Sequence, residues 1–301
     1  RKVGCTAKGG SMPIVNATEM LLKATAENYA VGAFNVTNFI QMKAVVETAV
    51  EKKSPVIIQT SVTPSKFRGP AVFAAVFRAM ANNAPVPICL HIDHCNEVDY
   101  CKRCADAGYT NVMIDASYHD FEENIRQTRE VADYCHTMNI SVEGELGTVS
   151  GVEDQVVVAE DEAQLCDPDL AVEFVDKTGI DLLAPAIGTA HGVYKTKNPV
   201  LDFERLATIA GKINGRGPKT PLVIHGGTGL TEGTVKKLVS LGGSKFNVST
   251  ELKHRLLDTT HDYLVANRDQ YDPGKVDKVV LEAISGVIGK WMDLLGSTGR
   301  A

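Results

Sequence analysis

Three histidines stand at or just after segments of this sequence that are rich in apolar and β-branched residues. They are His94, His191 and His225, and they lie far apart along the chain. Neutral imidazoles are ligands of Zn²⁺ and similar divalent cations, and a catalytic site of this kind uses three protein ligands and leaves one position open. If the fold brings the three rings together, the sequence predicts a catalytic metal centre, with Zn²⁺ as the metal.

Acidic residues accompany these histidines. Asp93 directly precedes His94, and a carboxylate so close to a dication would ligate it or serve as an acid/base toward the substrate. Asp115 and Glu145 offer a second or alternative metal position, or an outer shell that orients the ligands. Glu153 lies in a segment that we expect to be a mobile loop over the site, and a closing loop can deliver a proton-transfer group.

Glycine-rich turns follow two of the same segments, at residues 188–192 and 225–229. Glycines allow backbone amides to approach an anion closely, and the loops after the last strands of α/β barrels commonly bind phosphate. Nearby side chains add hydroxyl and amide donors, and one lysine adds a positive charge. The predicted phosphate-binding and substrate-binding set is Gly192, Lys195, Gly226, Gly227, Thr228, Asn247, Ser249 and Thr250.

The elements that must position these residues follow one rhythm along the chain. Apolar segments alternate with longer segments of helical spacing, a pattern that indicates a parallel sheet covered on both faces. Eight such units in one undivided chain close most naturally into an α/β fold of the (β/α)₈ or TIM barrel type, with additional C-terminal helices. A doubly wound open sheet is the alternative, but its glycine-rich fingerprint after the first strand is missing. The predicted strands are 31–38, 54–61, 86–93, 111–117, 140–147, 181–188, 220–227 and 243–250.

In a barrel of this kind the catalytic groups lie at the C-terminal ends of the strands. The predicted strand ends carry polar or ionisable residues at nearly every position, including Asn35 on the first strand and Ser61 on the second. These side chains would converge on one mouth, which stability alone does not demand. His91 shares the side-chain direction of Asp93 and is expected to be a packed neighbour, not a ligand.

Composition limits the class of protein. The chain has 301 residues, 44% of them hydrophobic, and a net charge of −6, which is typical of a soluble globular protein. No basic surplus favours nucleic acid or an anionic membrane, and no apolar run approaches the roughly 20 residues needed to span a bilayer. We expect residues 1–11 to be an expression remnant and residues 12–301 to form a single barrel domain with a helical C-terminal extension.

Cysteine usage favours a reducing compartment. The chain has seven cysteines, an odd number, which suits a cytoplasmic protein. Cys95, Cys101 and Cys104 stand close together, and the last two have the spacing of a metal-binding or redox pair. Without a second such pair, packed thiols are the favoured interpretation, and the role of the cluster stays open.

The chain resembles the class II, metal-dependent aldolases, in particular the fructose-bisphosphate and tagatose-bisphosphate aldolase family. The resemblance covers the chain from Met12 to the C-terminal helix. It is carried by the motifs HIDH (91–94), MIDAS (113–117), EGELG (143–147), AIGTAHGVYK (186–195), VIHGGTG (223–229) and FNVST (246–250). The family fold is a (β/α)₈ barrel, in agreement with the strand count.

The resemblance implies a lyase of carbohydrate metabolism and glycolysis. Such an enzyme reversibly cleaves a ketose 1-phosphate, fructose 1,6-bisphosphate or a close relative, to dihydroxyacetone phosphate and an aldehyde. It implies that Zn²⁺ is bound by the three histidines, with a second divalent or a monovalent cation near Asp115 and Glu145. Asp93 would be the acid/base on the C4 hydroxyl, and Glu153 would move the C1 proton of dihydroxyacetone phosphate. The positions that match substrate contacts are Asn35, Ser61, Gly192, Lys195, Gly226, Gly227, Thr228, Asn247 and Thr250.

The distal end of the substrate is the point where the sequence departs from many relatives. Bisphosphate-cleaving members often carry an arginine just after the Thr250 motif, whereas this chain has Lys253. Lysine holds phosphate as a point charge and cannot form the bidentate fork. Fructose 1,6-bisphosphate, tagatose 1,6-bisphosphate and a ketose 1-phosphate with a non-phosphate tail therefore stay open, and Lys66 and Arg68 could read a different tail. The family also implies a homo-oligomer, a dimer or a tetramer.

Other classes of function compete with this interpretation. A Schiff-base aldolase would need a desolvated lysine at the C-terminal end of a strand, but Lys245 stands near the start of the eighth. A metal-dependent hydrolase usually has a His-x-His pair on its first strand, which is missing here. A non-catalytic sugar-phosphate binding protein is the remaining, more remote alternative.

Overall fold

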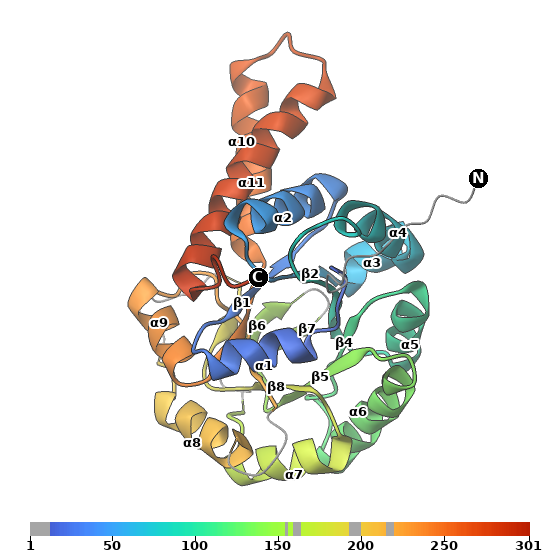
Figure 1. Ribbon diagram of the computed structural model, residues 1–301, viewed down its shortest axis with the longest axis vertical. Helices are drawn as coiled ribbons and strands as arrows, with labels where there is room; N and C mark the ends of the chain where they lie inside the picture. The colour runs from blue at the N-terminus through green and yellow to red at the C-terminus, as the bar shows by residue number, and fades with distance from the viewer. Residues whose placement is uncertain (1–12, 154–155, 159–163, 193–199, 215–219) are drawn as a thin grey trace, which may run out of the picture.

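Eight parallel strands close into a barrel (Figure 1). The computed structural model describes residues 13–153, 156–158, 164–192, 200–214 and 220–301. The order of the strands around the barrel is β1-β11-β10-β8-β5-β4-β3-β2. Their bounds are β1 Val31–Asn35, β2 Val56–Ser61, β3 Ile88–Cys95, β4 Asn111–Ile114, β5 Ser141–Leu146, β8 Leu182–Pro185, β10 Leu222–Ile224 and β11 Gly243–Val248. The TIM barrel predicted from the sequence is confirmed, and each predicted strand segment overlaps one barrel strand; β3 extends two residues beyond its predicted end.

Helices surround the barrel because each connection between parallel strands must cross over a face of the sheet. Asn38 begins α2 by accepting a hydrogen bond from the Gln41 amide, and Asp120 begins α6 in the same way through Glu123. The helices of this ring are α2 Phe39–Lys52, α3 Val62–Arg68, α4 Pro70–Ala81, α5 Val98–Ala107, α6 Phe121–His136, α7 Pro168–Thr178, α8 Phe203–Asn214 and α9 Glu232–Ser240. Amphipathic helices with one apolar stripe produce this ring.

Two apolar cores hold the architecture together. The larger one lies between the strands and the surrounding helices. The smaller one fills part of the barrel interior, where Ile57, Leu182 and Val223 pack with residues of α1 Thr18–Ala26. In Figure 1, α1 lies across the centre of the ring of helices. This apolar filling leaves the polar part of the interior at the end of the strands where the predicted site residues stand.

The C-terminal helices project away from the barrel. Helix α10 spans Thr250–Ala266 and α11 spans Pro273–Leu295, and together they form the long arm of the molecule in Figure 1. The two extra C-terminal helices predicted from the sequence are confirmed. The C-terminal half of α11 packs on the barrel through buried residues such as Ile284 and Trp291. Among the described residues, no helix is both long and apolar enough to cross a membrane.

A small second sheet replaces the loop that we expected around Glu153. Strand β6 Ser150–Glu153 pairs antiparallel with β7 Val156–Val158 and parallel with β9 Ala190–His191. The expectation of a loop was therefore wrong for residues 150–153. Valine has a high strand propensity, so the three consecutive valines of β7 favour strand pairing. The predicted expression remnant, residues 1–11, lies outside the described residues.

The larger apolar core, between the strands and the helices, predicts that truncating two residues of α7 has different effects on stability. Phe174 is fully buried against Phe121 and the β5 strand, whereas Leu170 is 40% exposed on the same helix. Truncation of a buried phenylalanine leaves a cavity, so we expect Phe174→Ala to lower the free energy of unfolding by roughly 3–5 kcal/mol. Leu170→Ala, the matched control, should change it by less than about 1 kcal/mol. Urea unfolding measures both, and equal effects would contradict the packing described here.

Candidate active site

An irregularity in β3 brings two consecutive residues to the same site. Neighbouring residues of a regular strand point to opposite faces. Between Ile92 and Cys95, three residue steps of β3 run beside two of β4, so β3 contains one extra residue. His94 takes the left-handed conformation, with φ of 46°, and its amide donates to the Met113 sulfur at 3.3 Å. This bulge explains how Asp93 and His94 both face the C-terminal mouth of the barrel.

His94 and His225 lie side by side at this mouth. Their ring centroids are 4.5 Å apart, and His225 directly follows β10. Asp115 Oδ2 lies 2.8 Å from His94 Nδ1, and Glu145 Oε2 lies 3.0 Å from His225 Nδ1. All four side chains are buried. The structure thus brings together two of the three predicted histidines and both predicted accessory carboxylates.

Three amide side chains hold the Asp93 carboxylate. Asp93 Oδ2 accepts hydrogen bonds from Asn35 Nδ2 at 2.8 Å and from Gln59 Nε2 at 3.1 Å. Asp93 Oδ1 accepts one from Asn247 Nδ2 at 3.0 Å. Asn35 and Asn247 were predicted from the strand ends, but Gln59 was missed because it lies two residues before the end of β2. The alternation of β2 places Gln59 on the same face as Ser61, and that pattern could have found it.

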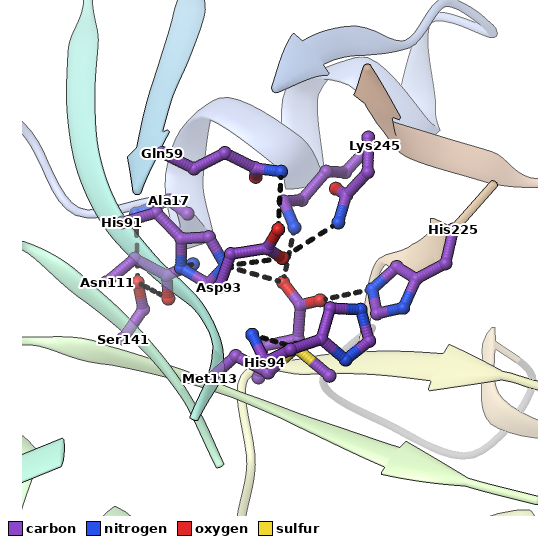
Figure 2. A network of polar contacts seen from close by, with 12 residues as sticks. Ala17, Gln59, His91, Asp93, His94, Asn111, Met113, Ser141, His225 and Lys245 are labelled. Atoms are coloured by element: carbon purple, nitrogen blue, oxygen red, sulfur yellow. Dashed lines mark hydrogen bonds and ion pairs between the residues drawn. The ribbon is translucent and has the colours of Figure 1, made fainter. Parts of the chain in front are cut away.

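A second group of buried polar residues lies next to these side chains, and Figure 2 shows its members His91 and Lys245 together with His225. Glu143 Oε1 lies 2.9 Å from His225 Nε2, and Glu143 Oε2 accepts a hydrogen bond from Lys245 Nζ at 2.8 Å. His91 packs beside this pair, and its Nδ1 is 2.9 Å from Asn111 Nδ2. The expectation that His91 is a packed neighbour agrees with this position.

The charges of the cluster shift the pKa values of its members. Burial disfavours the charged imidazolium of His94, but the hydrogen bond to Asp115 and the charge of Asp93 outweigh burial and raise its pKa well above the ordinary value. Burial and the charge of His94 would lower the pKa of His225, but its hydrogen bonds to the Glu143 and Glu145 carboxylates outweigh them and raise it. Burial would raise the pKa of Asp115, but His94 and Ser117 lower it to about 2. The cluster therefore favours positive charge between its carboxylates.

His91 behaves in the opposite way. Burial, followed by the nearby Lys245 ammonium, lowers the pKa of His91 to about 3. His91 Nε2 lies 3.8 Å from Glu143 Oε2 and 3.9 Å from Asp93 Oδ1, too far for hydrogen bonds. A neutral imidazole at this place separates two carboxylates without adding charge.

A cleft beside the cluster collects the predicted anion-binding residues. Thr250 begins the 17-residue helix α10, whose first backbone N–H groups and positive dipole end favour a bound anion. The Ser249 hydroxyl is buried and lacks a hydrogen-bond partner among the described residues. The residues that line the cleft are Asn35, Asp93, Gly192, Gly226, Gly227, Thr228, Asn247, Ser249 and Thr250. Nine of the predicted site residues therefore share one cleft.

Some predicted site residues are placed only in part. For His191 and Glu153 the structure describes the backbone alone, in β9 and β6, and Lys195 lies outside the described residues. Gly226 contacts the backbone of Ala190 so closely that β9 must lie beside the turn after β10. The backbone of His191 therefore lies near the residue that follows His225.

Two further predicted residues lie at the end of β2. Ser61 is buried and pairs in register with Asp93 across the β2–β3 ladder. The segment expected to offer Lys66 and Arg68 is helix α3, and Lys66 forms an ion pair with Glu97 while lying over the Tyr100 ring. Lys66 is therefore engaged within the protein in this structure.

The donor set of the cluster fits a divalent cation. Asp93, His94 and His225 each offer a ligand atom, and these atoms lie within 4.8 Å of one another; His94, Asp115 and Glu145 form a second such group. Nitrogen and oxygen ligands of Zn²⁺ lie about 2.0–2.2 Å from the ion, so two of them are separated by at most roughly 4.4 Å. Imidazole with carboxylate suits Zn²⁺ and similar borderline cations. Small side-chain adjustments would bring either group to this spacing.

A TIM barrel whose C-terminal mouth carries buried imidazoles and carboxylates beside an anion-binding cleft defines an enzyme of the α/β-barrel class. The sequence model of the family described as "Fructose-bisphosphate aldolase class-II" matches residues 15–300. The chain belongs to this family, so it is a class II aldolase, a carbon–carbon lyase.

Individual relatives agree over nearly the whole chain. A Bacillus subtilis (strain 168) protein named "Probable fructose-bisphosphate aldolase" is 42% identical over 294 residues, covering 96% of this chain and 100% of the relative. The fructose-bisphosphate aldolase of Geobacillus stearothermophilus is 41% identical over 300 residues, covering 96% and 99%. Among solved structures, the YdjI aldolase from Escherichia coli K12 gives a TM-score of 0.83 at 33% identity, covering 96% of this chain and 99% of that one.

The contact between Gly226 and β9 predicts a sensitive position. Gly226 has φ of 68°, and a Cβ atom there would overlap the Ala190 carbonyl. The left-handed conformation alone costs a non-glycine residue roughly 1–3 kcal/mol. We expect Gly226→Ala to lower the free energy of unfolding by at least this amount and to displace β9, which urea unfolding and an aldol-cleavage assay would measure.

Gly211 provides the matched control. It lies inside helix α8, and a Cβ atom there would meet nothing within 4 Å. Because alanine has the higher helix propensity, Gly211→Ala should raise stability by about 0.5–1 kcal/mol and leave cleavage unchanged. Equal behaviour of the two variants would contradict the close approach of β9 to the turn after β10.

Proposed function

We propose that this chain is a Zn²⁺-dependent aldolase that reversibly cleaves a ketose 1-phosphate, fructose 1,6-bisphosphate or a close relative, to dihydroxyacetone phosphate and an aldehyde. The observation that carries the proposal is the convergence of Asp93, His94 and His225 beside the cleft at the start of α10. Such an activity belongs to carbohydrate metabolism, and to glycolysis where the substrate is fructose 1,6-bisphosphate.

Asp93 is proposed to take the proton of the C4 hydroxyl group. Asn35, Gln59 and Asn247 hold its two oxygens, so the carboxylate enters the reaction already oriented. When the C3–C4 bond breaks, the electron pair stays with the three-carbon fragment and the other fragment leaves as an aldehyde. Return of a proton to the three-carbon fragment gives dihydroxyacetone phosphate, and Glu153 is the proposed donor.

The metal is proposed to be held by His94, His225 and His191. The carboxylates Asp115 and Glu145 would orient these ligands or hold a second divalent or a monovalent cation. When bound, Zn²⁺ supplies Lewis-acid stabilisation of the negative charge that develops on the substrate carbonyl oxygen. The support for this assignment is the mixed imidazole and carboxylate donor set and its preference for positive charge.

The C1 phosphate is proposed to bind at the N-terminus of α10. Gly226, Gly227, Thr228, Ser249 and Thr250 line the cleft there, and residues of these types offer backbone amides and hydroxyl groups as donors. Gly192 lies in the same cleft, and Lys195 is proposed to add its charge. Ser61 and Asn35 are proposed to lie beside the sugar carbons. This arrangement uses the helix terminus and hydroxyl donors to hold the anion.

The alternative substrates share these features and differ at the distal end. Lys253 lies in the first turn of α10, and with lysine in place of arginine the tagatose bisphosphate and 1-phosphates with other tails stay alternatives. A Schiff-base mechanism is disfavoured because Lys245 is fully buried and donates to Glu143. A non-catalytic sugar-phosphate binding protein stays the remote alternative.

Activity assays test this proposal directly. We expect Zn²⁺-loaded protein to release dihydroxyacetone phosphate from fructose 1,6-bisphosphate, measured by coupled NADH-dependent reduction with tagatose 1,6-bisphosphate offered in parallel. EDTA should abolish turnover. Asp93→Asn should lower kcat by roughly 10²- to 10⁴-fold because the proton acceptor is removed while its shape is kept.

Asp176→Asn is the control for this experiment, because Asp176 is an exposed carboxylate on α7 and should not affect turnover. Turnover that survives EDTA would contradict the metal-dependent mechanism. Zinc-loaded protein that cleaves neither bisphosphate would contradict the bisphosphate assignment and direct attention to 1-phosphates with other tails.

We further propose a cytoplasmic homo-oligomer, a dimer or a tetramer, in which the arm contacts a second copy of this chain. The arm exposes large apolar side chains, with Leu257 64%, Val265 57% and Tyr271 87% exposed. Exposed apolar patches on soluble proteins commonly mark interaction surfaces. The support is this arm together with the family resemblance.

Light scattering during size-exclusion chromatography tests the oligomer. We expect the wild type to elute with a mass of at least two chains, and the double variant Leu257→Asp/Val265→Asp to shift toward one chain because charge would be buried in the contact. Val72→Asp, at an exposed apolar residue of α4 away from the arm, should keep the wild-type mass. A monomeric wild type would contradict the proposal.

A further inference from the structure

A fully buried ion pair lies directly beneath one proposed metal ligand. Lys245 on β11 and Glu143 on β5 are both 0% exposed, and their strands are not neighbours in the barrel. Lys245 Nζ donates to Glu143 Oε2 at 2.8 Å, while Glu143 Oε1 lies 2.9 Å from His225 Nε2. One carboxylate from β5 therefore contacts a cation on β11 and an imidazole at the end of the neighbouring strand β10.

Packing alone does not call for charge at this place. Apolar side chains of similar volume often fill such a site with equal or greater stability, because a buried ion pair must recover the cost of removing both charges from water. Apolar side chains fill neighbouring positions of the interior, for example Leu182 and Val223, which are in register with Glu143 and Lys245. The role of the pair is therefore to be found in its effect on His225, which Glu143 contacts.

The geometry identifies that effect as control of the His225 ring. With Nε2 engaged by Glu143, the other ring nitrogen, Nδ1, is directed to the cluster, where it lies 3.0 Å from Glu145 Oε2. A histidine that ligates a metal usually donates its second N–H to a carboxylate, which fixes the tautomer and the ring orientation. Lys245 in turn fixes the carboxylate, since it occupies the oxygen that Glu143 does not present to His225.

We propose that Glu143 and Lys245 are positioning residues for the metal: Lys245 holds the Glu143 carboxylate, and Glu143 holds His225 so that Nδ1 faces the ion. This inference rests on the proposed metal site. It assigns a role to two residues that do not line the substrate cleft. The pair acts on the metal through His225 alone.

Zinc affinity and the spectrum of Co²⁺-substituted protein test the proposal. Both are measured on chelator-stripped and reloaded protein, with affinity obtained by competition against a chromophoric chelator. We expect Lys245→Met and Glu143→Gln to weaken zinc binding by roughly 10- to 100-fold and to alter the visible Co²⁺ bands, which report ligand geometry. Lys102→Met, which breaks the exposed Lys102–Glu130 pair at 2.7 Å, is the control and should change neither readout.

Two double variants separate positioning from a merely structural role. Glu143→Leu/Lys245→Met replaces the pair with apolar groups, so the metal-free protein should fold with at least wild-type stability in urea yet keep the weakened zinc affinity. Glu143→Gln/Lys245→Met keeps an oxygen acceptor for His225 Nε2 but removes the ammonium that holds it. This variant should therefore bind zinc more tightly than Glu143→Leu/Lys245→Met and more weakly than the wild type, with Co²⁺ bands between those of the two.

The outcomes are distinguishable. If Glu143→Leu/Lys245→Met binds zinc as tightly as the wild type and gives the same Co²⁺ bands, the pair is structural and the inference is overturned while the proposed metal site stands. If the wild type itself binds no zinc, the metal assignment and this inference both fall. Tight binding by the wild type, loss in the apolar double variant and intermediate affinity in the glutamine double variant would together support it.

Discussion

The need to compensate buried charge determines the side-chain contacts at the C-terminal ends of the barrel strands. Asp93, His94, Asp115, Glu145 and His225 are all at most 8% exposed. An ionised group removed from water without a partner costs several kcal/mol, so each of these side chains must face a hydrogen-bond donor, an acceptor or an opposite charge. The strands meet this demand by placing partners from across the interior, and the resulting contacts leave the side chains little freedom to move.

Two kinds of compensation operate within one barrel, and they leave different charges behind. Asp93 is held by amide groups, which stabilise the carboxylate by hydrogen bonds and add no net charge. Glu143, in contrast, is neutralised by Lys245. Burial and the ion pair act in opposite directions on the pKa of Glu143, and Lys245 with His225 holds it well below its ordinary value. Hydrogen bonds therefore compensate the Asp93 carboxylate, whereas an opposite charge compensates the Glu143 carboxylate.

The sequence predicts the scaffold better than the directions of its side chains. Alternation of apolar strands and amphipathic helices predicts all eight barrel strands. Strand ends also predict most of the cleft. The direction of His94 was not predictable, because it depends on a one-residue bulge that tertiary pairing creates. Asp93 and His94 do lie at one mouth, as predicted, but the bulge causes this arrangement and strand periodicity does not.

Partners that stand far apart in sequence explain the other omissions. Lys245 and Glu143 are separated by 102 residues and come from strands that are not adjacent, so neither motif nor spacing links them. Gln59 lies inside a strand, where a search limited to strand ends does not look. The small sheet of β6, β7 and β9 arises from pairing between segments on either side of β8, and a local pattern of a few valines is too short to predict it.

The polar interior also connects the two ends of the barrel. The Ala17 amide, just before α1, donates to Ser141 Oγ at 3.0 Å, and Ser141 donates to Asn111 Oδ1 at 2.7 Å. Asn111 contacts His91, which packs between the Asp93 and Glu143 carboxylates. The helix that closes the bottom and the residues at the mouth are thus joined by one column of contacts. Hydrogen-bond geometry tolerates only small displacements. The position of α1 therefore helps to fix the position of His91 along the barrel axis and the separation of the Asp93 and Glu143 carboxylates on either side of it.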